Sequence, residues 1–184
     1  MKRIIDVTLA SISVLLFLPL MAVVVILILI ADRGPIFYKQ IRIGLHGKEF
    51  YLYKFRTMCV DADKIGPYST AVGDKRITRV GKFLRKTSID ELPQILNVIK
   101  GDMSIVGPRP NVPQQLVHYS DSDWQLRHSV KPGITGLAQS TLRSLATEEQ
   151  RLNLDLSYVK KNSIVGDFKI IAMTVKQVFF KGGN

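Results

Sequence analysis

Two adjacent acidic residues, Asp90 and Glu91, follow a cluster of basic residues near the middle of the chain. The basic residues Lys82, Arg85 and Lys86 lie within about two helical turns upstream. Neighbouring residues of a helix point about 100° apart, so the two carboxylates can serve one site in different roles. One can attack phosphorus while the other binds a divalent cation. Because phosphate is negative, this chemistry needs nearby cations, and the pattern therefore indicates phosphoryl transfer.

Prolines near the acidic pair allow a structural interpretation of that pair, and they also point to a further candidate residue. Pro93 cannot donate to the carbonyl of Ile89, so a helix should break and restart near residues 88–90. Acidic side chains at such a restart can act simply as helix caps, and this reading stays open. Arg109 lies between two prolines, which present its guanidinium stiffly for bidentate phosphate binding.

The elements that must position these residues can be read from the hydrophobic pattern. Residues 34–58 alternate around a Gly44–Gly47 turn and predict a β-hairpin, and 61–74 reads as a loop. Residues 79–100 carry apolar side chains at helical spacing. We also expect rigid loop segments at 107–110 and 131–136. The fold class is therefore expected to be α+β and mainly helical, with a small hairpin.

A long apolar segment precedes these elements. Residues 7–31 carry no charge, and as a helix they would be about 37 Å long, more than the ~30 Å hydrocarbon core of a bilayer. This length exceeds that of a signal-peptide apolar region. Pro19 favours a kink, so the segment can be a re-entrant helix that keeps both basic flanks in the cytoplasm. A plain spanning anchor with a tolerated proline is the alternative.

A second membrane signal lies near the C-terminus, where apolar residues recur at helical spacing. These residues are Ile164, Phe168, Ile171, Val175 and Val178. They suit a helix that faces the protein core and equally an interfacial amphipathic helix resting on anionic lipid.

Composition excludes several classes of protein. The chain has 184 residues, with 26 Lys and Arg against 15 Asp and Glu, for a net charge of +11. Cys59 is the only cysteine, which excludes a disulfide framework and a cysteine-rich metal site. The basic charge indicates a polyanionic partner. Nucleic acid is not expected, because aromatic residues do not interleave with the basic ones and no nucleic-acid-binding signature is present.

Four sequence blocks resemble the bacterial sugar transferase family, which are monotopic polyprenyl-phosphate phosphoglycosyl transferases. The blocks are Lys54–Met58, Ser88–Gln94, Lys100–Pro110 and Val130–Gly136 with Gln139. They occur in the family's order and run through nearly the whole chain. Lys131 departs from the pattern, because the family more often has Arg at this place.

The resemblance implies an enzyme that transfers a sugar-1-phosphate from a UDP-sugar to polyprenyl (undecaprenyl) phosphate. UMP would be released, and the polyprenyl diphosphate sugar would begin glycoconjugate assembly at the cytoplasmic face of the bacterial inner membrane. Asp90 would be the nucleophile that carries a covalent phosphosugar, and Glu91 would contribute to Mg²⁺ binding. The expected substrate and phosphate contacts are Lys54, Arg85, Arg109, Lys131 and Gln139.

The same resemblance implies two parts and a set of partners. Residues 1–32 would form the re-entrant membrane helix, and 33–184 a cytosolic, membrane-associated catalytic domain. Inner-membrane lipid and downstream glycosyltransferases are the further expected partners. The competing interpretation is a membrane-tethered basic binding module without catalysis. Such a module would tolerate exchange of Asp90 and Glu91 for amides, whereas the transferase would be inactivated.

Overall fold

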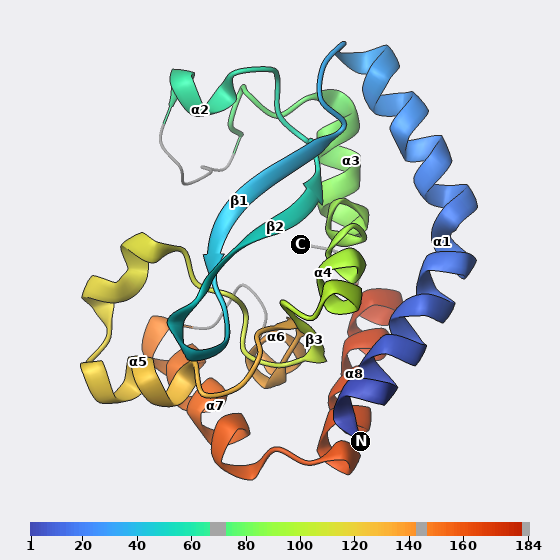
Figure 1. The fold of residues 1–184 in the computed structure, drawn as a ribbon. Helices are drawn as coiled ribbons and strands as arrows, with labels where there is room; N and C mark the ends of the chain where they lie inside the picture. Colours follow the sequence, from blue (N-terminus) through green and yellow to red (C-terminus); the bar gives the residue numbers. More distant parts are fainter. Residues whose placement is uncertain (67–72, 143–146, 182–184) are drawn as a thin grey trace.

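The computed structural model describes residues 1–66, 73–142 and 147–181, and it is mainly helical with two small sheets (Figure 1). The α-helices are α1 (Lys2–Ala31), α2 (Ala62–Ile65), α3 (Arg79–Thr87), α4 (Gln94–Lys100), α5 (Asp121–Arg127), α6 (Leu137–Thr141), α7 (Glu148–Lys161) and α8 (Ile164–Lys181). The strands are β1 (Phe37–Ile43), β2 (Glu49–Phe55), β3 (Ser104–Val106) and β4 (Gly133–Thr135), and the 3₁₀ turns are η1 (Leu45–Gly47), η2 (Ile89–Glu91) and η3 (Pro113–His118). The expected α+β, mainly helical class is confirmed.

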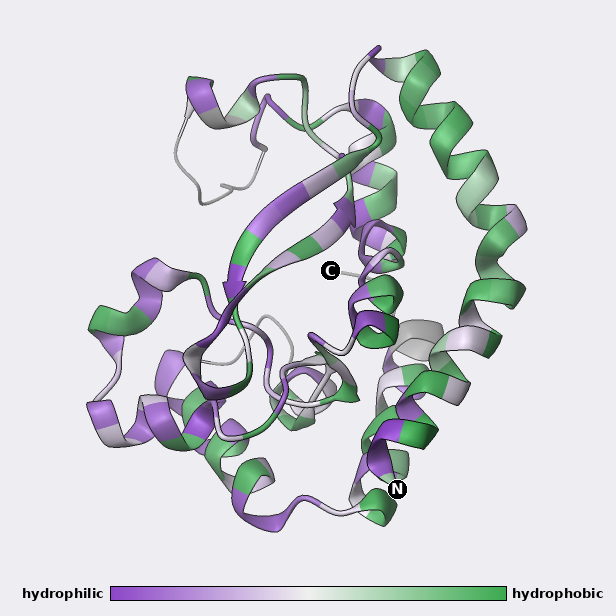
Figure 2. Ribbon diagram, viewed as in Figure 1, coloured by the Kyte–Doolittle hydropathy of each residue, from purple (hydrophilic) through white to green (hydrophobic). Residues whose placement is uncertain are grey.

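The uncharged segment belongs to a single 30-residue helix, α1, which continues through Pro19. Figure 1 shows α1 bowed, with its middle farther from the rest of the protein than its two ends. Val24 and Ile28 pack near its C-terminal end and Ala10 packs near its N-terminal end, whereas Leu15 and Leu16 are largely exposed. The ribbon of its middle is almost continuously hydrophobic (Figure 2). α1 is long and apolar enough to cross a membrane.

Polar bonds hold the N-terminal end of α1 to the rest of the protein. Lys2 forms an ion pair with Asp167 of α8. The buried carboxylate of Asp6 accepts hydrogen bonds from Ser104 Oγ, at 2.9 and 3.0 Å, and from the backbone N–H of Ile105 at 3.1 Å. These bonds fix the first turns of the helix against β3 and α8.

The C-terminal end of α1 is bonded to the segment that follows β2. Asp32 pairs with Arg56 at 3.3 Å and accepts a hydrogen bond from the backbone N–H of Val60 at 3.1 Å. Both ends of the apolar helix are therefore bonded to the same folded body.

The predicted hairpin is confirmed. β1 and β2 pair antiparallel, from Phe37 opposite Phe55 to Ile43 opposite Glu49. The turn between them contains Gly47 at φ +77°, a left-handed conformation that glycine adopts without steric cost. Figure 1 shows the hairpin beside α3 and α4, on the side away from α1. Its inner residues Leu52 and Phe55 are buried in the two core clusters that α1 also reaches.

The predicted helical segment 79–100 is interrupted where Pro93 requires it. α3 ends at Thr87, Ser88 is left-handed at φ 57°, and the 3₁₀ turn η2 precedes α4. α4 ends at Lys100 and is followed by Gly101, whose φ of 99° suits a helix C-terminus.

Two other segments differ from the expectation. The 131–136 segment, predicted as a rigid loop, contains β4, which pairs parallel with β3 through Ser104–Gly133 and Val106–Thr135. Three-residue strands carry too short an alternation to be recognised from sequence. The predicted loop 61–74 contains the single helical turn α2, and residues 67–72 lie outside the described part.

Candidate active site

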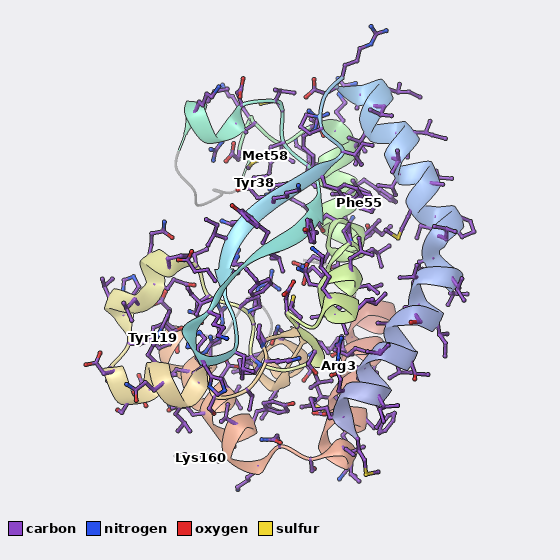
Figure 3. The ribbon with its side chains drawn as sticks, in the orientation of Figure 1. Arg3, Tyr38, Phe55, Met58, Tyr119 and Lys160 are labelled. Carbon is purple, nitrogen blue, oxygen red and sulfur yellow. The ribbon has the colours of Figure 1, made fainter. Side chains whose placement is uncertain are left out.

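The turn η2 presents Asp90 and Glu91 to the interior of a large cleft. The cleft has a volume of about 1570 Å³ and is lined by α3, η2, the hairpin, the segment after β3, and parts of α6, α7 and α8. Figure 3 labels Tyr38 and Met58, two of its lining residues, near the end of the hairpin that lies close to α3. Sequence predicted the acidic pair but not the cleft, because its walls come from distant parts of the chain.

Asp90 is buried, with 8% of its surface exposed, and its carboxylate is unpaired. Among the described residues no side chain or backbone N–H donates a hydrogen bond to it. The N-cap residue of α4 is Pro93, and no side chain caps that helix. The capping interpretation therefore does not describe Asp90. Burial raises the pKa of its carboxyl, although the charge of Lys54 acts in the opposite direction.

Glu91 is paired twice through one oxygen. Lys54 Nζ and Arg109 Nη2 each lie 2.7 Å from Glu91 Oε1. Burial acts to raise the pKa of Glu91, but the charges of Arg109 and Lys54 outweigh it and hold the pKa below its usual range. The two neighbouring carboxylates thus have opposite pKa shifts, a pattern typical of groups with different chemical roles.

The cation pair around Glu91 brings together residues that are far apart in the chain. Lys54 comes from β2, and burial lowers the pKa of its ammonium group. Arg109 comes from the segment after β3, keeps 40% of its side chain exposed, and has a pKa raised by the charge of Glu91. Both residues were predicted to contact phosphate, and they reach the same carboxylate oxygen.

A second group of cations lies on the α3 side of the cleft. Arg85 lines the cleft and donates from Nε to Thr57 Oγ1 at 2.9 Å, which orients its guanidinium. Lys82 and Lys86 also line the cleft. Gly81 permits this arrangement, because a Cβ there would lie 2.0 Å from the carbonyl oxygen of Thr57.

Two other predicted contacts have different positions. Gln139 lines the cleft, and neither polar atom of its buried amide has a partner within the described residues. Lys131 is absent from the described lining of the cleft, and its Nζ lies near Gly101 at the far end of α4. The structure therefore gathers Lys54, Arg85 and Arg109 with the acidic pair, and it leaves Lys131 apart.

Arg42 is a site residue that the sequence did not identify. It lies on β1, lines the cleft, and donates from Nη1 to the carbonyl of Pro110 at 3.0 Å. Burial and the nearby charge of Arg109 lower the pKa of Arg42 to about 10. In sequence it is one of many basic residues in a strand, and only the packing distinguishes it.

Known proteins resemble this chain over nearly its whole length. Residues 1–181 match the bacterial sugar transferase family. The chain belongs to the bacterial sugar transferase family. The match covers all four sequence blocks, so the resemblance predicted from them is confirmed. The matched residues include α1 and the residues that line the cleft.

This sugar transferase is similar in sequence to three bacterial proteins. It is 44% identical to "Uncharacterized sugar transferase EpsL" of Bacillus subtilis, covering 100% of the chain and 89% of the relative. It is 43% identical to the UDP-glucose:undecaprenyl-phosphate glucose-1-phosphate transferase of Xanthomonas campestris, covering 96% of the chain and 38% of the relative. The Escherichia coli protein of the same name is 40% identical, with 99% and 40% covered. The chain thus spans about two fifths of the latter two relatives.

Proposed function

We propose that this protein transfers a sugar-1-phosphate from a UDP-sugar to undecaprenyl phosphate and releases UMP. The observation that carries the proposal is the unpaired, buried carboxylate of Asp90 in a cleft lined by cations. The names of the relatives supply the class of donor and acceptor. The product, a polyprenyl diphosphate sugar, would begin assembly of a polysaccharide or another glycoconjugate.

The reaction proceeds in two displacements at one phosphorus. An oxygen of Asp90 attacks the phosphorus next to the sugar and forms a P–O bond, while the bond to the bridging oxygen breaks and UMP leaves. A phosphate oxygen of undecaprenyl phosphate then attacks the same phosphorus, the bond to Asp90 breaks, and the free carboxylate is restored. Asp90 must be ionised to attack, and its lack of hydrogen bonds leaves its lone pairs available.

The cations around Asp90 act on the charge of the diphosphate. Arg85 on α3 and Arg109 on the segment after β3 both line the cleft, and both can bind phosphate oxygens in fork geometry. Lys54 holds Glu91 beside them. Because these groups are held in place before substrate arrives, they stabilise the developing charge without reorganising.

The site also fits the Mg²⁺ that the family implies. Mg²⁺ is commonly bound by one or two carboxylates plus substrate phosphates and water, so a larger protein cage is not required. In the described residues no group of three or more potential ligands is present, but Glu91 Oε2 takes part in neither ion pair and stays available. Mg²⁺ held by Glu91 and the diphosphate would supply positive charge to the leaving phosphate.

The position of α1 supports the re-entrant arrangement. A helix that crossed the bilayer would carry one of its ends to the opposite surface. Here Lys2 is bonded to Asp167 and Asp32 is bonded to Arg56, so both ends belong to the same body. We therefore assign residues 1–32 to the membrane and 33–184 to a domain on one face of it. The basic residues that flank the apolar run favour the cytoplasmic face.

α8 extends this membrane surface. Asp167, Ile170 and Thr174 face the protein, whereas Phe168 and Val175 are about half exposed. The predicted apolar stripe is therefore divided: Phe168 and Val175 point outward, whereas Ile164 and Ile171 are partly buried and Ile171 packs against the core. The side chain of residue 178 lies outside the described part. Figure 1 shows α8 beside the N-terminal half of α1. An outward apolar face next to a membrane helix suits an interfacial position on lipid.

The test is UMP release by the full chain in nanodiscs with Mg²⁺, undecaprenyl phosphate and a panel of UDP-sugars. Release that depends on the lipid phosphate, and is absent in Asp90→Asn, is expected. Without acceptor, a sugar-labelled donor should label the wild-type protein covalently and leave Asp90→Asn unlabelled. Equal turnover by Asp90→Asn would refute the covalent mechanism. Failure to release UMP from any donor would favour the binding module.

A further inference from the structure

Arg109 belongs to a short segment whose backbone carbonyls are held by two other arginines. The carbonyl of Arg109 accepts a hydrogen bond from Arg127 Nη2 at 2.7 Å, and the carbonyl of Pro110 accepts one from Arg42 Nη1 at 3.0 Å. Arg127 also donates to the side-chain oxygen of Asn111. The segment is therefore anchored on both sides, and the Arg109 side chain projects from it to Glu91.

Arg127 makes these bonds from a fully enclosed position. Arg127 is the last residue of α5, and its side chain is 3% exposed. The carboxylate of Asp155 on α7 neutralises its charge, and the side chain of Asp155 is 1% exposed. Asp155 Oδ2 lies 2.7 Å from Nη2 and 3.1 Å from Nε of Arg127. Tyr119 is labelled beside α5 in Figure 3, and the centre of its ring lies 5.8 Å from the guanidinium carbon of Arg127. The Tyr119 hydroxyl accepts a hydrogen bond from Asn111 Nδ2 at 3.0 Å.

Stability alone is a weak reason for an enclosed ion pair. The desolvation of two charges offsets most of their attraction, so well-packed apolar residues often stabilise a protein equally well. An apolar pair, however, cannot donate to a backbone carbonyl. The bond from Arg127 to the Arg109 carbonyl is thus the property that an apolar replacement would lose. One guanidinium can make all of these bonds because its donors form a rigid fork.

We propose that Arg127 and Asp155 are positioning residues for Arg109. Asp155 fixes the guanidinium of Arg127, which fixes the 109–111 segment, so that the Arg109 side chain reaches Glu91 and the phosphates of the substrate. Neither residue touches the reacting atoms. This inference rests on the proposed function, since it describes how the phosphate-binding group of that site is held.

The first test replaces both charges at once in the full chain. Arg127→Met with Asp155→Leu removes the pair and leaves no unpaired charge, so we expect the protein to stay folded. Its melting temperature should be lower than that of the wild type, because the buried oxygens of Arg109 and Asn111 lose their donor. Displacement of Arg109 by about 1 Å should lower kcat/KM for the UDP-sugar by about tenfold to a hundredfold. A folded variant with wild-type kcat/KM would overturn the inference.

A double-mutant cycle separates positioning from a general structural effect. If the pair acts through Arg109, its removal in an Arg109→Ala background should cause little further loss of kcat/KM, because the group it positions is already absent. Independent, multiplicative losses would overturn the inference. Arg127→Lys, which keeps the charge opposite Asp155 but not the fork, covers the case of a double variant that does not fold. It should lower kcat/KM by about tenfold while the protein stays folded.

Hydrogen–deuterium exchange gives a readout that does not depend on the reaction. Removal of the pair should speed exchange in the peptide spanning residues 107–112, with little change in the β1–β2 hairpin. Unchanged exchange in that peptide would overturn the inference even if the enzyme is active. Absence of UMP release by the wild type would instead count against the proposed reaction, and faster exchange would still support the anchoring of this segment.

Discussion

Replacement of Lys54 by Met should destabilise the protein more than replacement of Arg109 by Met, although each residue makes one 2.7 Å bond to the same oxygen. The difference comes from exposure. The side chain of Lys54 is 18% exposed, that of Glu91 21%, and that of Arg109 40%. Solvent screens the Arg109 pair more strongly, so its removal should cost about 1 kcal/mol or less.

The loss of Lys54 should be larger. Breaking a buried pair costs about 3–5 kcal/mol when one charge is left alone. Because Arg109 still pairs with Glu91, we expect about 2–3 kcal/mol for Lys54→Met. In a chain of this size, 1 kcal/mol corresponds to about 2–4 °C, which gives a fall in melting temperature of about 5–10 °C.

Differential scanning fluorimetry in nanodiscs checks both variants, and pH supplies an internal control. The pKa of Glu91 is depressed in the folded state, so its ion pairs contribute stability above the ordinary glutamate range. That contribution is lost as pH falls through the lower, folded-state pKa. The difference between wild type and Lys54→Met should therefore shrink on acidification. Equal melting temperatures at neutral pH, or a difference that grows in acid, would refute the reasoning.

Three further outcomes test other parts of the molecule. Burial raises the pKa of Asp90, so UMP release should fall as pH drops through a value above the ordinary aspartate range of about 4. Asp90→Asn should raise the melting temperature at neutral pH while abolishing turnover, because it removes a charge that burial disfavours. A pH profile that stays flat down to pH 4 would contradict this assignment. Gly81→Ala should lower the free energy of unfolding by about 3 kcal/mol, because the new Cβ would lie 2.0 Å from the Thr57 carbonyl oxygen. Gly166→Ala on α8 should be tolerated. Denaturant unfolding of the two variants measures the difference. A nitroxide at residue 168 should show the oxygen accessibility of a bilayer, in contrast to one at residue 160 of α7, and equal aqueous accessibility of both labels would place α8 away from lipid.

Local chemistry in the sequence determined much of the segment that carries Asp90 and Glu91. Pro93 lacks the N–H that a continuous helix needs, so the break between α3 and α4 was predictable from one residue. The adjacent Asp90 and Glu91 had to emerge at that break. The Gly44–Gly47 turn likewise predicted the hairpin, and the uncharged run predicted α1. These features follow from backbone sterics and hydrophobic spacing within a few residues of each other.

Only the tertiary structure decided which charges meet. Lys54 lies 37 residues before Glu91 and Arg109 lies 18 residues after it, and no short-range rule specifies that both reach one oxygen. The same holds for Arg127, which holds the segment of Arg109 from the end of another helix, and for Lys131, which lies outside the described lining of the cleft.

Ion pairs between distant residues depend on how helices and strands pack, and packing is decided by the whole set of buried surfaces. The sequence could therefore identify the nucleophile candidate and the membrane segment. The opposite pKa shifts of the two carboxylates required the fold, because each shift is the balance between burial and charges delivered by other elements.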